Sequence, residues 1–137
     1  MRRSRFALAM STAAAALVAL SSAPAHADPT WYNGSVPAGC ESGALCVYRH
    51  INFDQGGWGV ANFHHTNARW VDTRNAYMAN NDSSWFNNGT PDVPSSVVVF
   101  GYQAFEDRHF CLDRGWGNSW DPDANDDGEA NWWVNGC

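Results

Sequence analysis

Lysine is absent from the chain, and basic residues of any kind are scarce. Three of the eight arginines lie at the extreme N-terminus, in a segment that we predict to be removed on export. The rest of the chain holds five arginines against fourteen Asp and Glu residues, a formal charge of −9. Such an acidic surface repels phosphate backbones, which argues against a nucleic-acid partner. The acidity itself is most simply explained as solubility outside the cell.

Long apolar runs are also absent, apart from one at the N-terminus that has the pattern of a secretory signal peptide. Arginines at positions 2, 3 and 5 precede an alanine-rich run at 6–20. Ala25-His26-Ala27 then has the small-x-small form of a signal-peptidase site. The run is too short for a membrane-spanning helix, and Ser, Pro and Asp follow it closely.

The composition after this segment suits one folded domain. A chain of 110 residues can bury a modest core, and eight tryptophans make it too aromatic for a disordered protein. We expect a secreted, extracellular monomer with no membrane partner. The predicted organisation is a signal peptide at 1–27, an N-terminal extension at 28–39 and a single domain at 40–137.

Signatures of the common catalytic sites are missing as well. The sequence has no G-x-S-x-G, no H-E-x-x-H, no Walker loop and no G-x-G-x-x-G. The adjacent residues His64 and His65 would point to opposite faces of a strand, so they are poorly placed to share a metal ion. The cysteines are expected to be oxidised, which leaves no thiolate nucleophile. We therefore predict that the protein is not an enzyme.

Four cysteines in an exported chain predict two disulfides, with three pairings open. Cys40 and Cys46 enclose only five residues, including Gly43, and so short a loop closes easily. Pairing them leaves Cys111 with Cys137, which ties the end of the chain to an internal strand. Zinc binding is the alternative, but the spacings match no zinc finger and export favours oxidation.

Helical periodicity is hard to find in the chain. Short apolar runs alternate with Gly, Asn, Asp and Pro, which is the pattern of an all-β protein. A short helical turn is predicted within 73–81, and 87–94 has the composition of a connection between two halves. Strands are predicted at 44–50, 57–63, 83–87, 96–102, 108–114 and 130–136.

An aromatic pair recurs along the chain. Tyr48 and Phe53 lie five positions apart, and Phe100 and Phe105 repeat the pair 52 residues later. Regular self-similarity of this kind indicates a duplicated structural unit.

A second similarity supports the duplication. Residues 80–88 align with 127–135 at an offset of 47, which places Trp85 and Trp132 on equivalent closing strands. Both tryptophans are therefore predicted to be core residues. The predicted repeats cover about 44–90 and about 96–137.

Together these residues resemble the Greek-key motif of the βγ-crystallins. That motif has two aromatic residues five positions apart, a glycine two positions further on and, about 30 residues later, the pattern Asn/Asp-x-x-Ser-Ser. The whole layout is similar to the secreted actinobacterial peptidase inhibitors of this fold, the Streptomyces metalloproteinase inhibitor group. The shared features are the export signal, "CESGALCVY", "SSW" at the close of the first half, and one cysteine in each outer strand of the second half.

The resemblance covers about residues 40–137. It implies an all-β, βγ-crystallin-like sandwich of two Greek-key motifs. It also implies a secreted inhibitor of an extracellular protease, with a zinc metalloprotease as the expected target.

The chain departs from the crystallin pattern at both turn glycines. Gln55 stands at the first of these positions and Asp107 at the second. The glycine of the motif has a positive φ, which Asp tolerates better than Gln. We therefore predict that the first turn is shifted by one residue and that Gly56 has the positive φ.

Crystallin-like domains often bind calcium through oxygen ligands on adjoining loops. Here Ala79 occupies the first acidic position of one candidate segment, and Ala130 and Asn131 replace the two hydroxyls of the other. The alternatives are a weak calcium site and an acidic turn exposed to solvent; no other cofactor is expected. The candidate ligands are Asn80, Ser83, Asp123, Asp126 and Asp127.

A protease inhibitor needs a stretch that an active site accepts but cannot easily distort. Because Cys111 would anchor the segment around it, Cys111–Leu112 is a candidate reactive bond, with a bulky apolar residue after the bond as thermolysin-like metalloproteases prefer. The alternative is that Phe110 and Leu112 face the core, as alternate strand residues usually do. The candidate inhibitory segment consists of Phe110, Cys111, Leu112, Asp113, Arg114 and Trp116.

Two other functions compete with protease inhibition. One is a structural or calcium-binding crystallin-like domain without a protease target. The other is a carbohydrate-binding module, because tryptophans such as Trp116 and Trp120 lie among Gly and Asn and are able to stack on sugar rings. Tryptophan is also enriched at protein interfaces, so its presence does not separate the two.

Overall fold

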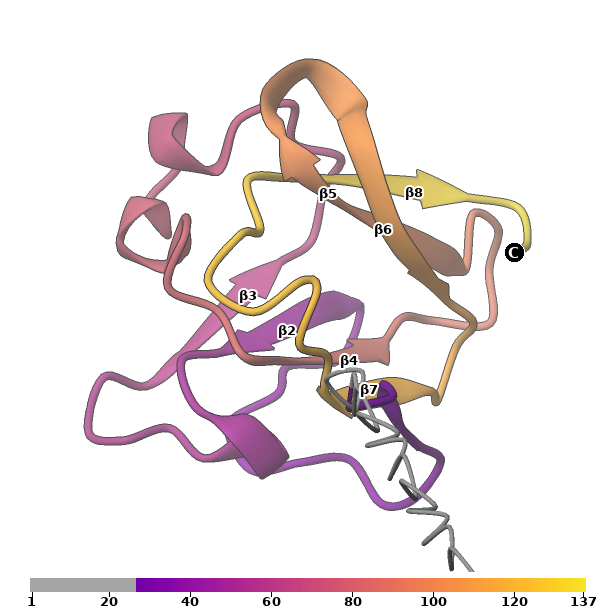
Figure 1. Cartoon of the computed structure of the whole chain (residues 1–137). Helices are drawn as coiled ribbons and strands as arrows, with labels where there is room; N and C mark the ends of the chain where they lie inside the picture. The colour runs from indigo at the N-terminus through magenta and orange to yellow at the C-terminus, as the bar shows by residue number, and fades with distance from the viewer. Residues whose placement is uncertain (1–26) are drawn as a thin grey trace, which may run out of the picture.

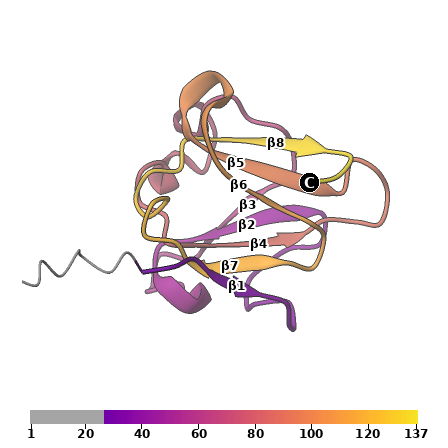
Figure 2. The same cartoon turned by 45° about the vertical axis from the view of Figure 1, so that its right-hand side comes forward.

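Eight strands form two antiparallel sheets that pack face to face (Figures 1 and 2). The computed structural model describes residues 27–137, so the predicted signal peptide lies, except for Ala27, outside the described residues. The five-stranded sheet has the order β1-β7-β4-β2-β3, and the three-stranded sheet has the order β6-β5-β8. The strands are β1 (Thr30–Tyr32), β2 (Ala44–Tyr48), β3 (Val60–Phe63), β4 (Ser84–Asn88), β5 (Ser96–Tyr102), β6 (Glu106–Leu112), β7 (Gly117–Trp120) and β8 (Ala130–Val134).

The only helical elements in the described part of the chain are single 3-10 turns. One of them falls within 73–81, where a helical turn was predicted. Within residues 27–137, no helix has the length and apolar character needed to cross a membrane. The turns are η1 (Ile51–Phe53), η2 (Trp70–Asp72), η3 (Ala76–Met78) and η4 (Gln103–Phe105).

Backbone pairing joins the two halves of the chain in both sheets. β2, β3 and β4 belong to the first half, and β7 from the second half pairs with β4 in the same sheet. In return, Asn67 of the first half forms an isolated bridge with Asn131 of β8 in the second sheet. The two Greek keys therefore form one domain, because the larger sheet contains a strand from the second half and a bridge links the first half to the smaller sheet.

The repeated aromatic pair marks an equivalent chain reversal, or corner, in both halves. The ring centroids of Tyr48 and Phe53 lie 5.6 Å apart, and those of Phe100 and Phe105 also lie 5.6 Å apart. In each corner the second aromatic residue and the one before it have a positive φ, which folds the second ring back over the strand. The prediction for Gly56 is confirmed, since its φ is 52°, and Asp107 takes a φ of 54° in the second half.

The main core lies between the two sheets. Strand alternation directs one set of side chains inward, so Leu45 and Val47 of β2 meet Val97 and Val99 of β5 there. The outer face of the five-stranded sheet is also covered, because Tyr32 and Phe53 pack against it. β2 is consequently buried on both faces. The core residues between the sheets are Leu45, Val47, Ala61, Phe63, Trp70, Met78, Ala79, Trp85, Val97, Val99, Phe110, Leu112 and Ala124.

The prediction that Trp132 is a core residue is wrong. Trp85 is fully buried, whereas Trp132 is 48% exposed on the outer face of the three-stranded sheet. The first aromatic residue of each corner pairs with Ser84 in the first half and with Ala130 in the second. These partners are 46 residues apart, not 47 as predicted, and a shift of one residue turns every side chain of a strand to the opposite face.

Asn131 takes the inward position in β8 that Trp85 holds in β4. Its side-chain oxygen accepts a hydrogen bond from Nε1 of Trp70 at 2.9 Å, and its amide donates to the backbone oxygen of His65 at 2.9 Å. A buried amide is tolerated there because its hydrogen-bonding groups are paired.

Two strands were not predicted from the sequence. β1 lies within the predicted extension at 28–39 and pairs with β7 at the edge of the larger sheet. β7 reads Gly-Asn-Ser-Trp, which lacks the alternation of apolar residues that indicates a strand. Both strands form by pairing with distant parts of the chain, and a local sequence pattern does not predict such pairing.

Candidate functional site

The loops at one end of the sandwich are held by both disulfides and by hydrogen bonds from asparagine side chains. This end, here called the loop end, includes the β4–β5 connection and the C-terminus, which lie to the right in Figure 2. The opposite end, here called the corner end, contains η1 and η4. The loop end comprises 41–43, 90–95, 113–116 and 135–137; the corner end comprises the two corners, 79–83 and 121–129.

The candidate inhibitory segment divides into a buried part and an exposed part. Phe110 and Leu112 are 6% and 1% exposed and belong to the core between the sheets, the alternative that strand alternation favoured. Cys111 points to the outer face of the three-stranded sheet. Asp113, Arg114 and Trp116 follow on an exposed turn. As folded, the side chain of Leu112 is therefore not available to a protease pocket.

Turn 113–116 is closed by a hydrogen bond from the backbone N–H of Trp116 to the backbone oxygen of Asp113, at 3.0 Å. Gly115 has a φ of 82°, a conformation that glycine adopts without steric cost. The carboxylate of Asp113 accepts a hydrogen bond from the hydroxyl of Ser96 at 2.6 Å. Arg114 forms no ion pair with any residue in 27–137, and Trp116 is 43% exposed.

Asn87 of β4 anchors this turn by hydrogen bonds. Its backbone N–H donates to the oxygen of Trp116 at 2.9 Å, and its backbone oxygen accepts from the N–H of Gly115 at 2.8 Å. Its fully buried side chain donates to the backbone oxygens of Leu112 at 2.8 Å and Ser95 at 2.9 Å. One residue of β4 thus fixes turn 113–116 and the end of the β4–β5 connection together.

Both predicted disulfides are present. Cys111 pairs with Cys137, so the strand before the turn is joined covalently to the C-terminus. Cys40 pairs with Cys46 across the outer face of the other sheet, and within residues 27–137 no cysteine is free.

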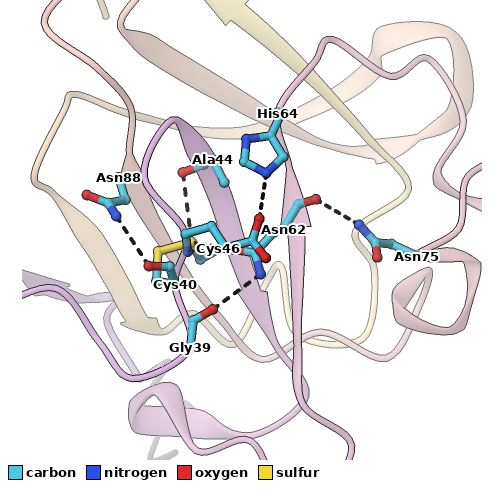
Figure 3. Close-up of polar contacts among 9 residues, drawn as sticks. Gly39, Cys40, Ala44, Cys46, Asn62, His64, Asn75 and Asn88 are labelled. Carbon is cyan, nitrogen blue, oxygen red and sulfur yellow. Dashed lines mark hydrogen bonds and ion pairs between the residues drawn. A yellow bond between two sulfur atoms is a disulfide. The ribbon is translucent and has the colours of Figure 1, made fainter.

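The loop closed by the first disulfide is organised by Asn62 of β3 (Figure 3). The side-chain oxygen of Asn62 accepts from the backbone N–H of Glu41 at 2.9 Å, and its amide donates to the oxygen of Gly39 at 3.2 Å. Nε2 of His64 lies 2.8 Å from the carboxylate of Glu41. Asn88 adds a contact from its amide to the oxygen of Cys40 at 3.4 Å. This loop is rigid, although Glu41 and Ser42 are exposed.

A buried carboxylate links the two halves at the corner end. Asp82 accepts hydrogen bonds from Nε1 of Trp85 at 2.7 Å and from the backbone N–H of Gly128 at 2.9 Å. Burial raises the pKa of Asp82 to about 7, and the neighbouring charge of Asp126 acts in the same direction, while the hydrogen bonds oppose it.

Of the five candidate calcium ligands, Asn80, Ser83 and Asp126 line one hollow at the corner end, whereas Asp123 and Asp127 do not line it. Asn80 donates to Glu129 at 2.8 Å, Ser83 donates to Asn125 at 2.6 Å, and Asp127 lies 3.2 Å from His109. The carboxylate of Asp126 accepts from the amide of Asn125, and Asp123 is exposed. Across residues 27–137, no group of three or more His, Cys, Asp or Glu side chains is placed to hold a metal ion.

Comparison with known proteins first defines the fold and then the family. A solved structure from work on the evolution of the eye lens βγ-crystallin domain fold aligns with 75% of this chain and 95% of its own, with a TM-score of 0.54 and 15% sequence identity. The family model of peptidase inhibitor family I36 matches residues 35–112. No curated protein matches the chain.

The match covers more than half of the chain, so the chain belongs to peptidase inhibitor family I36 and has a βγ-crystallin fold. It is therefore a protease inhibitor rather than an enzyme, and a protease is its partner.

Sequence reasoning missed the residues that position the loops. Asn87 and Asn88 were assigned to a strand end and a turn on composition, and Asn62 had no predicted role. The only local signal was the density of asparagine beside apolar strands, since a buried amide is well suited to binding the backbone of a neighbouring loop.

Proposed function

We propose that this chain inhibits an extracellular zinc metalloprotease and that turn 113–116 makes the primary contact with the enzyme. The observation that supports the proposal is the combination of restraint and exposure in one short segment. Asn87 and the disulfide Cys111–Cys137 restrain the turn, whereas Arg114 and Trp116 face solvent.

Restraint favours inhibition for two physical reasons. A loop that is already ordered loses little conformational entropy on binding, so more of its contact energy contributes to affinity. A bound segment must also distort before an enzyme can cleave it, and covalent and hydrogen-bonded anchors resist that distortion. Arg and Trp are the residue types that most often dominate binding energy in protein interfaces.

Burial of Leu112 favours the turn over the Cys111–Leu112 bond as the contact. The backbone of Leu112 pairs with Val97 in β5, and its side chain fills the core. Presenting that bond to an active site would require the end of β6 to leave its sheet. The turn offers its side chains without any rearrangement.

Sequence features support two parts of this proposal: that the target is a metalloprotease and that the protein acts outside the cell. The arrangement of cysteines and the "CESGALCVY" segment resemble the metalloproteinase inhibitor group, and the N-terminal segment has the pattern of an export signal. The acidic character of the predicted secreted chain suits a soluble monomer in the medium.

The test is an inhibition assay with the chain purified from the culture medium. We expect inhibition of a thermolysin-like metalloprotease and none of a serine or a cysteine protease. Arg114→Ala and Trp116→Ala should each raise the Ki by about tenfold or more, as expected for interface residues of this type. Tyr102→Ala, which truncates an exposed aromatic residue beside η4, is the matched control and should leave the Ki unchanged.

A chain that inhibits only a serine or cysteine protease would contradict the metalloprotease assignment. Folded Arg114 and Trp116 variants that inhibit like the wild type would remove turn 113–116 from the site.

A further inference from the structure

We infer that the loop closed by Cys40–Cys46 is a second contact segment for the same protease, and that Glu41 and Ser42 form this contact beside turn 113–116. The inference rests on the proposed function and adds a second, separate part to its binding site. Family membership and the predicted reactive segment do not assign any role to this loop.

Interface size requires more surface than one turn. Stable protein–protein interfaces bury about 800 Å² on each partner and involve about 20–30 residues a side. Turn 113–116 provides four residues. Neighbouring loops must therefore take part, and the structure indicates which loop is both close and rigid.

The first-disulfide loop and turn 113–116 are attached to the same end of β4. Asn88 accepts a hydrogen bond from the N–H of Gly43 at 2.7 Å, on the side of β4 that faces β2. Asn87 accepts from the N–H of Gly115 at 2.8 Å, on the side that faces β7. Adjacent strands lie about 4.8 Å apart, so Gly43 and Gly115, on either side of β4, are separated by about 10 Å, well within one interface.

Like turn 113–116, the first-disulfide loop is already held in one conformation before a protease binds. The disulfide, Asn62 and the contact between His64 and Glu41 hold it from three directions (Figure 3). The side chain of Glu41 is nevertheless 58% exposed. Ser42 is exposed, and no hydrogen bond within residues 27–137 engages its hydroxyl. The carboxylate of Glu41 is an acceptor, and the hydroxyl of Ser42 can both accept and donate. The enzyme segment that meets Glu41 should therefore carry N–H donors or a basic side chain.

A hollow beside the loop offers space for a side chain of the enzyme. Its volume is about 330 Å³, and it lies between the loop, the residues after β3 and the β4–β5 connection. Val93, in that connection, is 71% exposed at its border. The lining includes Gly43, His64, Thr66, Thr90, Asp92 and Val93.

The experiment compares Ser42→Arg with Ile51→Arg in the full chain purified from the medium. Both variants place one arginine at an exposed position, the first on the proposed contact and the second in η1 at the corner end. The Ki is measured against whichever protease the wild type inhibits, and melting temperatures verify folding. We expect Ser42→Arg to raise the Ki at least tenfold and Ile51→Arg to change it less than twofold.

Ser42→Glu is the second variant and keeps the test decisive if Ser42→Arg does not fold. It should also raise the Ki, because the longer side chain holds the two surfaces apart and its carboxylate loses its water in the contact. If both folded Ser42 variants inhibit like the wild type while Trp116→Ala is weakened, the inference is wrong and the proposed function stands. If Ile51→Arg raised the Ki as much as Ser42→Arg, the inference would also be wrong, because an added arginine would then weaken inhibition wherever it is placed. A wild type that inhibits no protease would overturn the proposed function and this inference together.

Discussion

The two ends of the sandwich are constrained in different ways. At the corner end, buried side chains join one half of the chain to the other, as Asp82 does when it binds Gly128. At the loop end, disulfides and asparagines bind the backbone and leave side chains such as Arg114 exposed. The residues that hold the two halves together are therefore different from the residues that shape the exposed loops. Variants at the corner end should change stability, and variants at the loop end should also change inhibition.

The largest effect should come from the core that supports both ends. Trp85→Ala removes a fully buried side chain and should lower the free energy of unfolding by about 4 kcal/mol. Trp132→Ala, at the position wrongly predicted to be equivalent, should cost about 1 kcal/mol or less, because that ring is half exposed. Urea denaturation of both variants measures the difference. Equal losses would contradict the 46-residue register of β8.

The next largest effect should come from the two disulfides of the loop end. Replacing Cys111 and Cys137 by Ser opens a loop with a sequence separation of 26 and should cost about 3.5 kcal/mol in the free energy of unfolding. Replacing Cys40 and Cys46, with a separation of 6, should cost about 2 kcal/mol.

Both serine pairs should also raise the Ki, because each disulfide anchors a proposed contact. Urea denaturation and the inhibition assay test the two parts of the prediction separately. Stability losses with an unchanged Ki would show that the disulfides serve the fold alone, and would remove the functional distinction between the two ends.

The smallest effect, taken per pH unit, should be the pH dependence due to Asp82. The unfolded chain loses this proton near the ordinary pKa of 3.8, whereas the folded chain keeps it until about pH 7. Between these values the folded state binds one more proton, so the free energy of unfolding should fall as pH rises, by at most about 1.4 kcal/mol per pH unit. Asp82→Asn should remove this slope and leave the Ki unchanged.

The measurement is urea denaturation of the wild type and Asp82→Asn between pH 5 and pH 8. Asp123→Asn, an exposed acid on the adjoining segment, is the control and should follow the wild type at every pH. Parallel curves for the wild type and Asp82→Asn would show that Asp82 is ionised in the fold throughout this range.

Much of the fold could be predicted from local patterns. The corners at Phe53 and Phe105 have an aromatic spacing that appears in the sequence, and the positive φ of Gly56 follows from the inability of Gln55 to adopt it cheaply. The disulfide pairing followed from the shortness of one loop. β7 could not be predicted, because Gly-Asn-Ser-Trp becomes a strand only through its pairing with β4 and β1.

The candidate site was less predictable than the fold. The segment around Cys111 was identified from its anchor, but strand geometry decided that Leu112 faces the core. Asn87 and Asn62 had no detectable signature, because their role is to bind backbone groups that are distant in the sequence.

The amino-acid sequence was enough to identify the duplicated aromatic corners and the pairing of the cysteines, and through them an all-β domain of two Greek keys. These features depend on spacings of a few residues, or on repetition that remains visible along the chain. Three further features became visible only in the folded chain: Trp132 lies outside the core, Leu112 lies inside it, and the first-disulfide loop lies beside turn 113–116. The physical reason is register: a shift of one residue in a strand exchanges its two faces, and pairing with distant strands fixes that register.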